Sequence, residues 1–386
     1  MSLIRIGSSS APMVKAAVNE LAMQLGGQEY ALVAYFCADT YDLAALASEM
    51  RQTFPPPSSL IGCTTAGEIG LSGFQNGSIV AIGLPKEHFV VATTLLPELA
   101  KFEVAASQKN VASTMRHSGL LRESSGFHDS FALMLIDGLS MREEPLGRAV
   151  QLMLGDIPVI GGSAGDSLHF RQTQVFHNEQ MVSNAAVMAI ISTDLPFRTL
   201  KTQHFERTEG RMVVTEARPQ ERIVSEINGL PAALEYARIV GIPVEKLSPM
   251  AFAAHPVVVR IGGQEYVRSI QKVNPDNSLS FYCAIDQGIV LSRAKGLDAE
   301  SNLADMLEKV AAEIGPLQAV LACNCVLRTL EFQQHNQIEA ISKILRKFNA
   351  VGFSTFGELY RGIHVNQTFT GVAFGKPETH TESEAS

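Results

Sequence analysis

The stretch Ile61-Gly-Cys-Thr-Thr-Ala-Gly-Glu68 occurs in three similar copies along the chain. The other two are Ile160-Gly-Gly-Ser-Ala-Gly-Asp166, which is one residue shorter, and Val351-Gly-Phe-Ser-Thr-Phe-Gly-Glu358. Each copy has a β-branched residue, a Gly, small or hydroxyl residues, another Gly and then an acid. A motif repeated in this way indicates a structural unit that is itself repeated.

The surroundings of the three copies also match. Upstream of each lies a short apolar run, then a stretch with helical spacing, and downstream lies another apolar run. An apolar run between turn signals is typical of a buried strand, and a helix between two strands indicates a parallel crossover. The sequence therefore predicts an α/β fold of three strand-helix-strand units with mostly parallel, buried strands and Gly-rich turns. The segments are 31–36, 41–54 and 78–84; 131–136, 145–154 and 185–191; and 319–322, 337–348 and 369–374.

The chain between copies two and three has a different character. Its apolar residues alternate in short runs with turn signals at 262–263 and 275–277, which predicts hairpins and a β-rich middle insertion. The spacing over 221–240 favours a helix. We expect one domain of two repeats over 28–225 and a second over 226–375, which holds the β-rich part and the third repeat. The polar segment 376–386 is expected to be a disordered tail.

Composition narrows the class of protein. The 386 residues are 46% hydrophobic and 18% charged, with a formal net charge of −8 and no dense run of Lys and Arg. These values argue against direct binding of nucleic acid. No apolar run approaches the roughly 20 residues that span a bilayer, and the first residues do not form a signal peptide. The five cysteines suggest no disulfide framework. We therefore expect a cytoplasmic protein without membrane insertion.

The Gly-rich turns leave several functions open. Their backbone N–H groups can bind an anion, or their glycines can simply allow tight packing. Ser163 lies in a Gly-x-Ser-x-Gly pattern, and Cys325 is a second candidate nucleophile, so a hydrolase is a further, less favoured alternative. If the turns instead form a ligand pocket, its candidate residues are Thr64, Glu68, Ser163, Asp166, Ser354 and Glu358.

Taken together, these residues resemble the FIST family of sensory domains over nearly the whole chain. The resemblance has an N-terminal region of about residues 28–225 and a C-terminal region of about 230–375. It rests on the three Gly-rich turns, on Ile227-Asn-Gly229 with Pro231-Ala232 and Tyr236, and on the pair Cys325 and Arg328. Within the family, the chain looks most similar to the nitric oxide sensing protein (NosP) group. The segments that carry this closer likeness are 192–197, 201–205, 252–260, 266–273, 281–286, 323–328 and 364–371.

That resemblance implies a sensor, not an enzyme, which binds haem b non-covalently and responds to nitric oxide. It implies signalling by contact with a histidine kinase or a cyclic-di-GMP enzyme in the control of biofilms, and it leaves a homodimer open. We expect His204 to be the axial ligand of the haem iron, with His255 and His364 in reserve, because imidazole is a common ligand. Arg260 and Arg268 are candidates for pairing with the propionates. The alternative is a FIST sensor of a small organic ligand, such as an amino acid, without haem.

Overall fold

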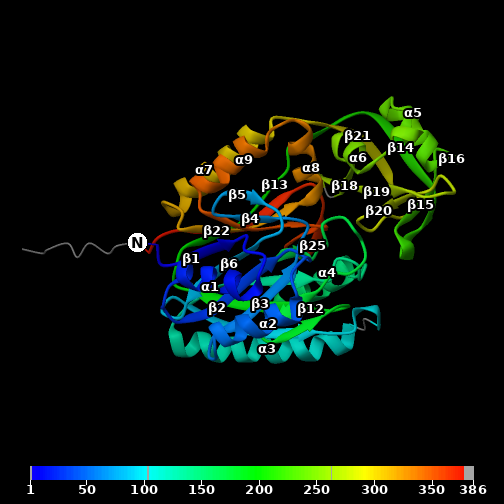
Figure 1. The fold of residues 1–386 in the computed structure, drawn as a ribbon. Coiled ribbons are helices and arrows are strands. Elements are labelled where there is room, and N and C mark those ends of the chain that lie inside the picture. Colours follow the sequence, from blue (N-terminus) through cyan, green and yellow to red (C-terminus); the bar gives the residue numbers. More distant parts are fainter. Residues whose placement is uncertain (1, 102–103, 262, 378–386) are drawn as a thin grey trace, which may run out of the picture.

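Three six-stranded sheets surround one shared core, and a further sheet forms a lobe at one side (Figure 1). The computed structural model describes residues 2–101, 104–261 and 263–377. The predicted tail lies outside this part of the chain from residue 378 onward. The predicted α/β class is confirmed, because each of the three sheets is mixed and is covered by helices.

Each copy of the repeat forms a strand-helix-strand crossover with parallel strands. The first strand pairs in parallel with the strand that carries the Gly-rich motif, and the predicted helix lies between them in sequence. The third crossover holds an additional helix, α8 (Val326–Gln334). The units are β2 (Tyr30–Cys37), α2 (Leu43–Thr53) and β3 (Ser59–Thr64); β8 (Asp129–Ile136), α4 (Glu143–Leu154) and β9 (Val159–Ser163); and β22 (Ala319–Cys325), α9 (Ile338–Lys347) and β23 (Ala350–Thr355).

Outside these crossovers, the strand pairs that the structure describes are antiparallel. The sheets are therefore mixed, and the prediction of mostly parallel strands is wrong. The physical reason is that the strand after each Gly-rich turn returns through a short hairpin and not through a crossover helix. It therefore enters the sheet antiparallel to the first strand. These returning strands are β6 (Ile79–Pro85) beside β2, β12 (Ala186–Thr193) beside β8, and β26 (Phe369–Phe374) beside β22.

The short hairpins are exchanged among the three units in a closed cycle. The hairpin of the first unit pairs with β23, that of the second with β3, and that of the third with β9. Each sheet therefore contains strands from two repeats, so no unit completes its sheet alone. The hairpins are β4 (Glu68–Gly70) and β5 (Gly73–Gln75), β10 (Val175–His177) and β11 (Gln180–Val182), and β24 (Glu358–Tyr360) and β25 (Ile363–Val365).

The first glycine of each motif is explained by this packing. A Cβ on Gly62 would lie 2.2 Å from the carbonyl oxygen of Tyr35 on the neighbouring parallel strand. On Gly161 the same atom would lie 1.9 Å from Met134 O, and on Gly352 it would lie 1.8 Å from the oxygen of Ala322. A side chain has no room at these positions, so the repeated glycine serves close approach of two strands.

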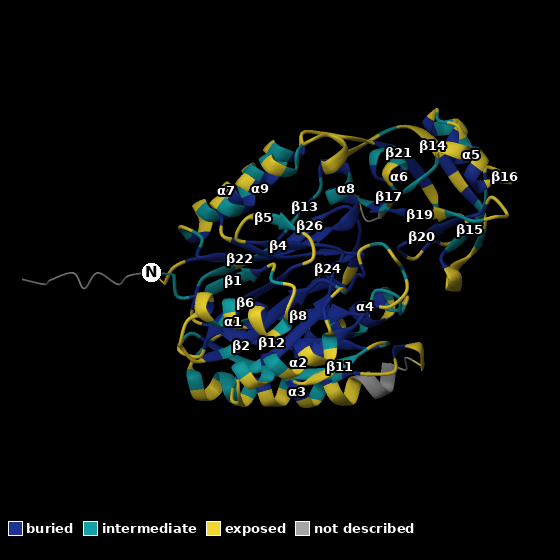
Figure 2. Cartoon of the chain, in the orientation of Figure 1, coloured by how far each residue is buried: buried dark blue, intermediate teal, exposed yellow. Residues whose placement is uncertain are grey.

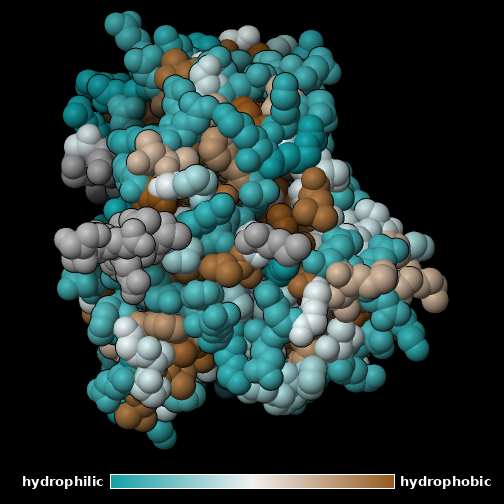
Figure 3. Space-filling view, turned by 90° about the vertical axis from the view of Figure 1, so that its left-hand side faces the viewer, coloured by the Kyte–Doolittle hydropathy of each residue, from teal (hydrophilic) through white to brown (hydrophobic). Residues whose placement is uncertain are grey.

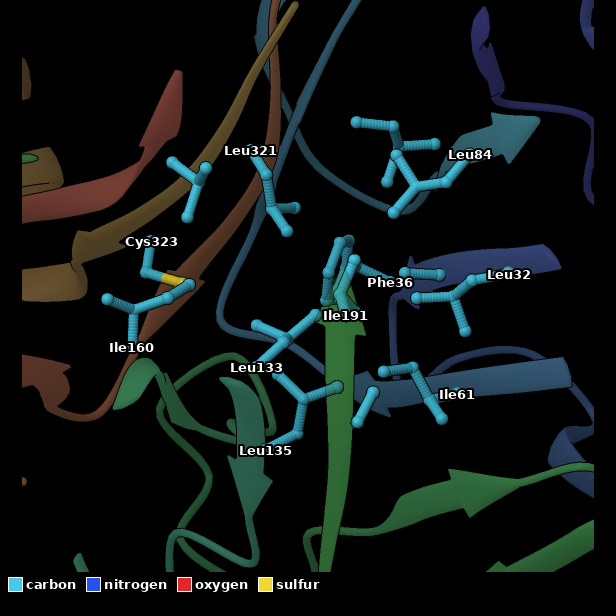
Figure 4. Close-up of a cluster of buried hydrophobic side chains, with 14 of the residues drawn as sticks. Leu32, Phe36, Ile61, Leu84, Leu133, Leu135, Ile160, Ile191, Leu321 and Cys323 are labelled. Carbon is cyan, nitrogen blue, oxygen red and sulfur yellow. The ribbon is translucent and has the colours of Figure 1, made fainter. Parts of the chain in front are cut away.

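The inner faces of the three sheets share one hydrophobic core (Figure 4). Leu32, Leu133 and Leu321 come from the first strands of the three units and are all buried there. The outer faces carry the helices, whose exposed sides show in yellow over the dark blue strands (Figure 2). These helices are α1 (Val14–Leu25) and α2 on the first sheet, α3 (Val104–Ser125) and α4 on the second, and α7 (Ala299–Ile314) and α9 on the third. The remaining strands of these sheets are β1 (Arg5–Ser9), β7 (Phe89–Leu96) and β13 (Phe197–Thr202).

The side lobe is built from residues 205–296 and is rich in strands, as predicted for the middle of the chain. The helix predicted over 221–240 is wrong in its first part, because Ile223–Ile227 is a strand and the helix is only Ala232–Val240. Asn228 and Gly229 both have positive φ and turn the chain into a hairpin before the helix begins. The elements are β14 (Phe205–Arg218), β15 (Ile223–Ile227), β16 (Leu230–Pro231), α5 (Ala232–Val240), α6 (Pro249–Ala254), β17 (Val257–Ile261), β18 (Gln264–Arg268), β19 (Ile270–Val273), β20 (Leu279–Phe281) and β21 (Val290–Gly296).

The surface drawn in Figure 3 is mainly hydrophilic, and its hydrophobic residues form small separate patches. Patches of this size are ordinary for a folded domain. Within residues 2–101, 104–261 and 263–377, no helix combines the length and the apolar character that crossing a membrane requires.

Candidate functional site

The acids of the first and third Gly-rich turns are buried and hold their own turns together. Glu68 accepts hydrogen bonds from the Thr65 hydroxyl, from the backbone N–H of Ser78 at 3.1 Å and from the Ser78 hydroxyl at 2.7 Å. Glu358 accepts the equivalent bonds from Thr355 and Thr368, at 3.1 Å to N–H and 2.6 Å to hydroxyl. Both carboxyl groups therefore have protein hydrogen-bond donors from their own repeat unit.

Burial also changes the protonation of these two acids. It raises the pKa of Glu68 above its ordinary value, although the hydrogen bonds from Thr65 and Ser78 oppose the shift. Burial raises the pKa of Glu358 to about 7, against the opposing bonds from Thr355 and Thr368. A carboxyl group whose pKa is raised carries less negative charge near neutral pH, which makes it a weaker partner for a ligand amine.

The other predicted turn residues are also occupied by protein contacts. Asp166 accepts the backbone N–H groups of Phe170 at 2.9 Å and Gln172 at 3.0 Å. Thr64 Oγ1 accepts the backbone N–H of Gln174 at 3.1 Å, and the Ser354 hydroxyl lies 3.1 Å from the Thr329 hydroxyl. The structure thus places these turn residues in the packing of the repeat.

The two candidate nucleophiles lie in surroundings that do not activate them. The Ser163 hydroxyl is buried and donates to Glu143 Oε1 at 3.3 Å, and among the described residues it has no histidine partner. Cys325 is buried, and burial raises the pKa of its thiol well above the usual range. A thiol must ionise to attack, so this cysteine is held in its unreactive form.

His204, the residue predicted to bind haem iron, lies in a buried polar network. Its Nε2 lies 2.9 Å from Glu331 Oε1, and its Nδ1 lies 2.8 Å from Nη1 of Arg328. A guanidinium can only donate hydrogen bonds, so Nδ1 of His204 is the acceptor. Nε2 therefore carries the hydrogen and donates a hydrogen bond to Glu331. Burial lowers the pKa of this histidine, although Glu331 opposes the shift. Both nitrogens are thus engaged, and the residues around His204 do not fit a haem iron.

His255 and Arg260 lie apart from the other haem candidates. His255 follows α6 and is partly buried, and burial lowers the pKa of its imidazole. Arg260 is exposed on β17, opposite Glu265 of β18. Neither residue lines the groove that His364 and Arg268 share.

His364 and Arg268 line one groove of about 450 Å³, which we call the arginine groove. It lies between α4, β18 and the hairpin β24–β25, and its volume is in the usual range of small-molecule sites. The side chains that matter here are Arg148, Arg268, Arg361, Tyr266, Leu152 and His364. The structure therefore joins two predicted haem residues that lie far apart in sequence, and adds two arginines that sequence reasoning missed.

Three arginines and one carboxylate, that of Glu144, line the groove, so it is positive on balance in an acidic chain. Arg148, Arg268 and Arg361 form no ion pair within the described part of the chain. The formal net charge of the whole sequence is −8. The Nε of Arg268 is buried and has no hydrogen-bond partner among the described residues. Unpaired guanidinium groups beside apolar surface match the carboxylates of an amphipathic anion.

His364 forms the inner wall of the groove. Its Nδ1 lies 2.9 Å from Glu144 Oε1, and its Nε2 is buried without a hydrogen-bond partner in the described residues. Histidines that bind metals commonly give their other ring nitrogen to a carboxylate, as this one does. The free Nε2 lies against Gly357, where a Cβ would be 2.0 Å away.

A charged network links the groove to the side lobe, and we call it the junction network. Arg222 donates to Glu143 at 2.6 Å, to Glu144 at 2.5 Å and to the carbonyl oxygen of Tyr282 at 2.6 Å. Glu144 also accepts the backbone N–H of Ala284 at 2.6 Å and contacts His364. The network therefore ties α4 both to the lobe and to the third repeat.

The electrostatics of this network favour the charged forms. Burial would raise the pKa of Glu144, but His364 and Arg222 outweigh it, so the pKa of this carboxyl is lowered. Burial would likewise lower the pKa of the Arg222 guanidinium, but Glu143 and Glu144 raise it. Sequence reasoning missed these residues because the two glutamates carry no motif and their partners are distant in sequence.

Two family models match the chain. The FIST N domain model matches residues 31–230, and the FIST C domain model matches residues 232–361. A curated relative, the uncharacterized protein MJ1623 of Methanocaldococcus jannaschii, is 24% identical over 255 residues. The matched part is 56% of this chain and 49% of the relative, so the chain spans about half the length of that protein.

Proposed function

Because the chain belongs to the FIST family, whose domains are sensory domains in signal transduction, we propose that it is a sensor which holds haem in the arginine groove and responds to nitric oxide. One observation carries the proposal: the groove gathers His364 and Arg268 with two further arginines that form no ion pair among the described residues, beside Leu152 and the ring of Tyr266. An amphipathic macrocycle with two carboxylates matches this combination.

The residues of the groove have distinct tasks in this proposal. Arg148, Arg268 and Arg361 would pair with the propionates, and the apolar side chains would contact the macrocycle. His364 would hold the iron, with Glu144 fixing its other nitrogen. In this structure Nε2 faces Gly357, so the ring would have to turn toward the groove. Bound haem would supply the iron at which nitric oxide binds.

The resemblance to nitric oxide sensing proteins supports the same location. Two of the segments that carry it are 266–273 and 364–371. They supply Tyr266, Arg268 and His364 to the groove. Two segments that carry this resemblance and are distant in sequence thus line the same groove.

The junction network offers a route from the groove to a partner protein. A change at His364 alters a bond to Glu144, and Glu144 holds Arg222 and the backbone of Ala284 in the lobe. A ligand shifts a conformation only as far as it binds the two conformations with different affinity. We propose that the lobe moves against the second repeat and is read by a histidine kinase or a cyclic-di-GMP enzyme in contact with it.

The rival, an amino-acid sensor built on the Gly-rich turns, has weaker support. An ammonium group needs a free carboxylate, and Glu68, Asp166 and Glu358 are each bonded within their own turns. These acids would have to break buried hydrogen bonds before they could hold such a ligand.

Haem titration of the purified chain, followed by absorption, tests the proposal. We expect a stoichiometric Soret band that shifts when nitric oxide is added to the ferrous form. Arg268→Gln should weaken haem binding by about tenfold, because it removes a charge-assisted pair. Arg260→Gln is the matched control, since this exposed arginine lies outside the groove. His364→Ala should change the Soret position and the nitric oxide response.

A wild-type protein that takes up no haem would overturn the proposal. Haem binding that is weakened by Arg260→Gln but not by Arg268→Gln would place the haem elsewhere. A spectrum unchanged by His364→Ala would remove this histidine as the iron ligand.

A further inference from the structure

A second cavity, of about 340 Å³, lies where the repeats meet the side lobe. We call it the aromatic cavity. Gly138 follows β8, Phe170 follows β9 and Phe356 follows β23, and all three line it together with the hairpin β19–β20. The cavity thus lies beyond the carboxyl ends of parallel strands, where α/β sheets commonly bind ligands.

Three aromatic rings form its apolar wall. The centroid of Phe170 lies 4.9 Å from that of Phe356 and 6.0 Å from that of Tyr282. These separations are those of aromatic rings that pack directly against one another, and the sides of the rings that line the cavity can contact a further flat ring. The wall therefore favours a planar, apolar body.

The charges around the cavity leave one group without a partner. Arg222 and Glu143 pair with each other at 2.6 Å, and Glu221 pairs with Arg218 at 3.4 Å. Lys272 lines the cavity and forms no ion pair within the described residues. Lys272 is therefore the charged group of the lining that has no counter-charge among the described residues, and its ammonium can attract an anion.

A buried hydroxyl adds a hydrogen-bond requirement. Tyr282 is only 5% exposed, and its hydroxyl has no partner among the described residues. Burial raises the pKa of this phenol, so the group stays neutral and can donate. A buried donor without an acceptor is costly, and a ligand oxygen would satisfy it.

We propose that the aromatic cavity binds an aromatic carboxylate, with its ring against Phe170 and Phe356, its negative charge toward Lys272 and an oxygen that accepts from Tyr282. An amino acid fits less well, because Glu143 is already bonded to Arg222 and Ser163 and cannot receive an ammonium group. The ligand would bridge the turns of the repeats and the lobe. This site is separate from the arginine groove and does not depend on haem.

The test uses 2-naphthoate as the probe and the purified full-length chain. The chain contains no Trp, so the emission of the naphthalene ring can be followed without tryptophan background. We expect saturable binding, and at least about tenfold weaker binding of the uncharged 2-naphthylmethanol because it lacks the charged acceptor. Lys272→Gln should weaken 2-naphthoate binding several-fold, because this lysine is exposed to solvent. Tyr282→Phe should also weaken it several-fold.

Lys246→Gln is the matched control, because Lys246 is exposed in the same lobe, outside the cavity. It should leave the affinity unchanged. The proposal is overturned if 2-naphthoate does not bind saturably, if the alcohol binds as tightly, or if Lys272→Gln binds like the wild type. Because the haem spectrum reports only on the arginine groove, either proposal can fail without the other.

Discussion

Two turns of the repeated core and the junction with the side lobe treat their buried polar groups differently, although the hydroxyls of Tyr35 and Thr370 in the repeats are also buried without a partner among the described residues. In the core, Glu68 and Glu358 each accept three hydrogen bonds from equivalent positions. At the junction, the hydroxyl of Tyr282, Nε of Arg268 and Nε2 of His364 are buried without partners among the described residues. Buried polar groups are normally bonded, so unsatisfied ones need an explanation such as an absent ligand.

This difference directs the search for functional residues to the junction and away from the two acids of the turns. The motifs that stand out in the sequence recur three times because each sheet needs the same glycine. Two of the turns also need a buried glutamate that accepts hydrogen bonds from the turn. The lobe occurs once, and the arginine groove and the aromatic cavity both lie where it meets the repeats. Four predictions test this division, from the largest expected effect to the smallest.

Removing Arg222 should have the largest effect on stability. Arg222→Ala leaves Glu143 and Glu144 without their shared cation, and breaking a buried pair costs about 3–5 kcal/mol. Arg218→Ala is the control, because its side chain is 46% exposed and its ion pair with Glu221 is worth less than about 1 kcal/mol. Urea unfolding measures both. Equal losses in the two variants would show that the junction network does not stabilise the chain.

The Glu358 carboxyl should make stability fall as pH rises. Burial raises its folded pKa to about 7, whereas the unfolded value is near 4.5. The folded state therefore holds the proton more tightly, and its contribution is present at pH 4.5 and lost as pH rises through 7. The loss is about 3 kcal/mol. Glu358→Gln should flatten this part of the stability profile. A variant with the wild-type slope would contradict the shift.

The first glycine of the second motif should tolerate no side chain. Gly161 has φ 145°, and a Cβ there would lie 1.9 Å from Met134 O. We expect Gly161→Ala to cost about 3 kcal/mol of unfolding free energy through overpacking. Gly241→Ala, where a Cβ meets open space and the backbone is in the left-handed region at φ 80° and ψ 28°, should cost only about 1 kcal/mol. Thermal unfolding measures both variants. Similar losses of unfolding free energy would mean that the close packing of the two parallel strands does not require the motif glycine.

The smallest effect is expected at the junction hydroxyl. Tyr282→Phe removes a group with no partner in the described residues, so the unfolding free energy should change by less than about 0.5 kcal/mol. Tyr30→Phe is the contrast in the core, because its hydroxyl donates to Leu25 O at 2.5 Å. That variant should lose about 1–2 kcal/mol. A large loss at Tyr282 would make this hydroxyl structural and weaken the ligand interpretation of the cavity.

Much of the core could be predicted from the sequence because it repeats. The three crossovers and their helices follow from apolar runs and motif spacing, as in β8, α4 and β9. The antiparallel return and the cyclic exchange of hairpins could not be predicted, because strand partners such as β24 and β9 are about two hundred residues apart and local pattern carries no signal for them.

The candidate site was less accessible to sequence reasoning. His364 and Arg268 were predicted from a resemblance, but their meeting in one groove depends on the lobe packing against the third repeat. Arg148, Arg222 and Glu144 carry no motif, so only the structure identifies them. His204 was favoured as the iron ligand, and its pairing with Arg328 and Glu331 involves residues more than a hundred positions away.

Hydrogen exchange of the full chain, measured by mass spectrometry, tests most directly whether ligand responses belong to the junction and not to the core. The protein would be compared without haem, with ferrous haem, and with ferrous haem and nitric oxide. The account predicts slower exchange with haem in α4 and in segments 266–284 and 358–366, a further change there with nitric oxide, and unchanged exchange in β2 and β3. Changes spread equally through β2 and β3, or none in the junction segments, would contradict it.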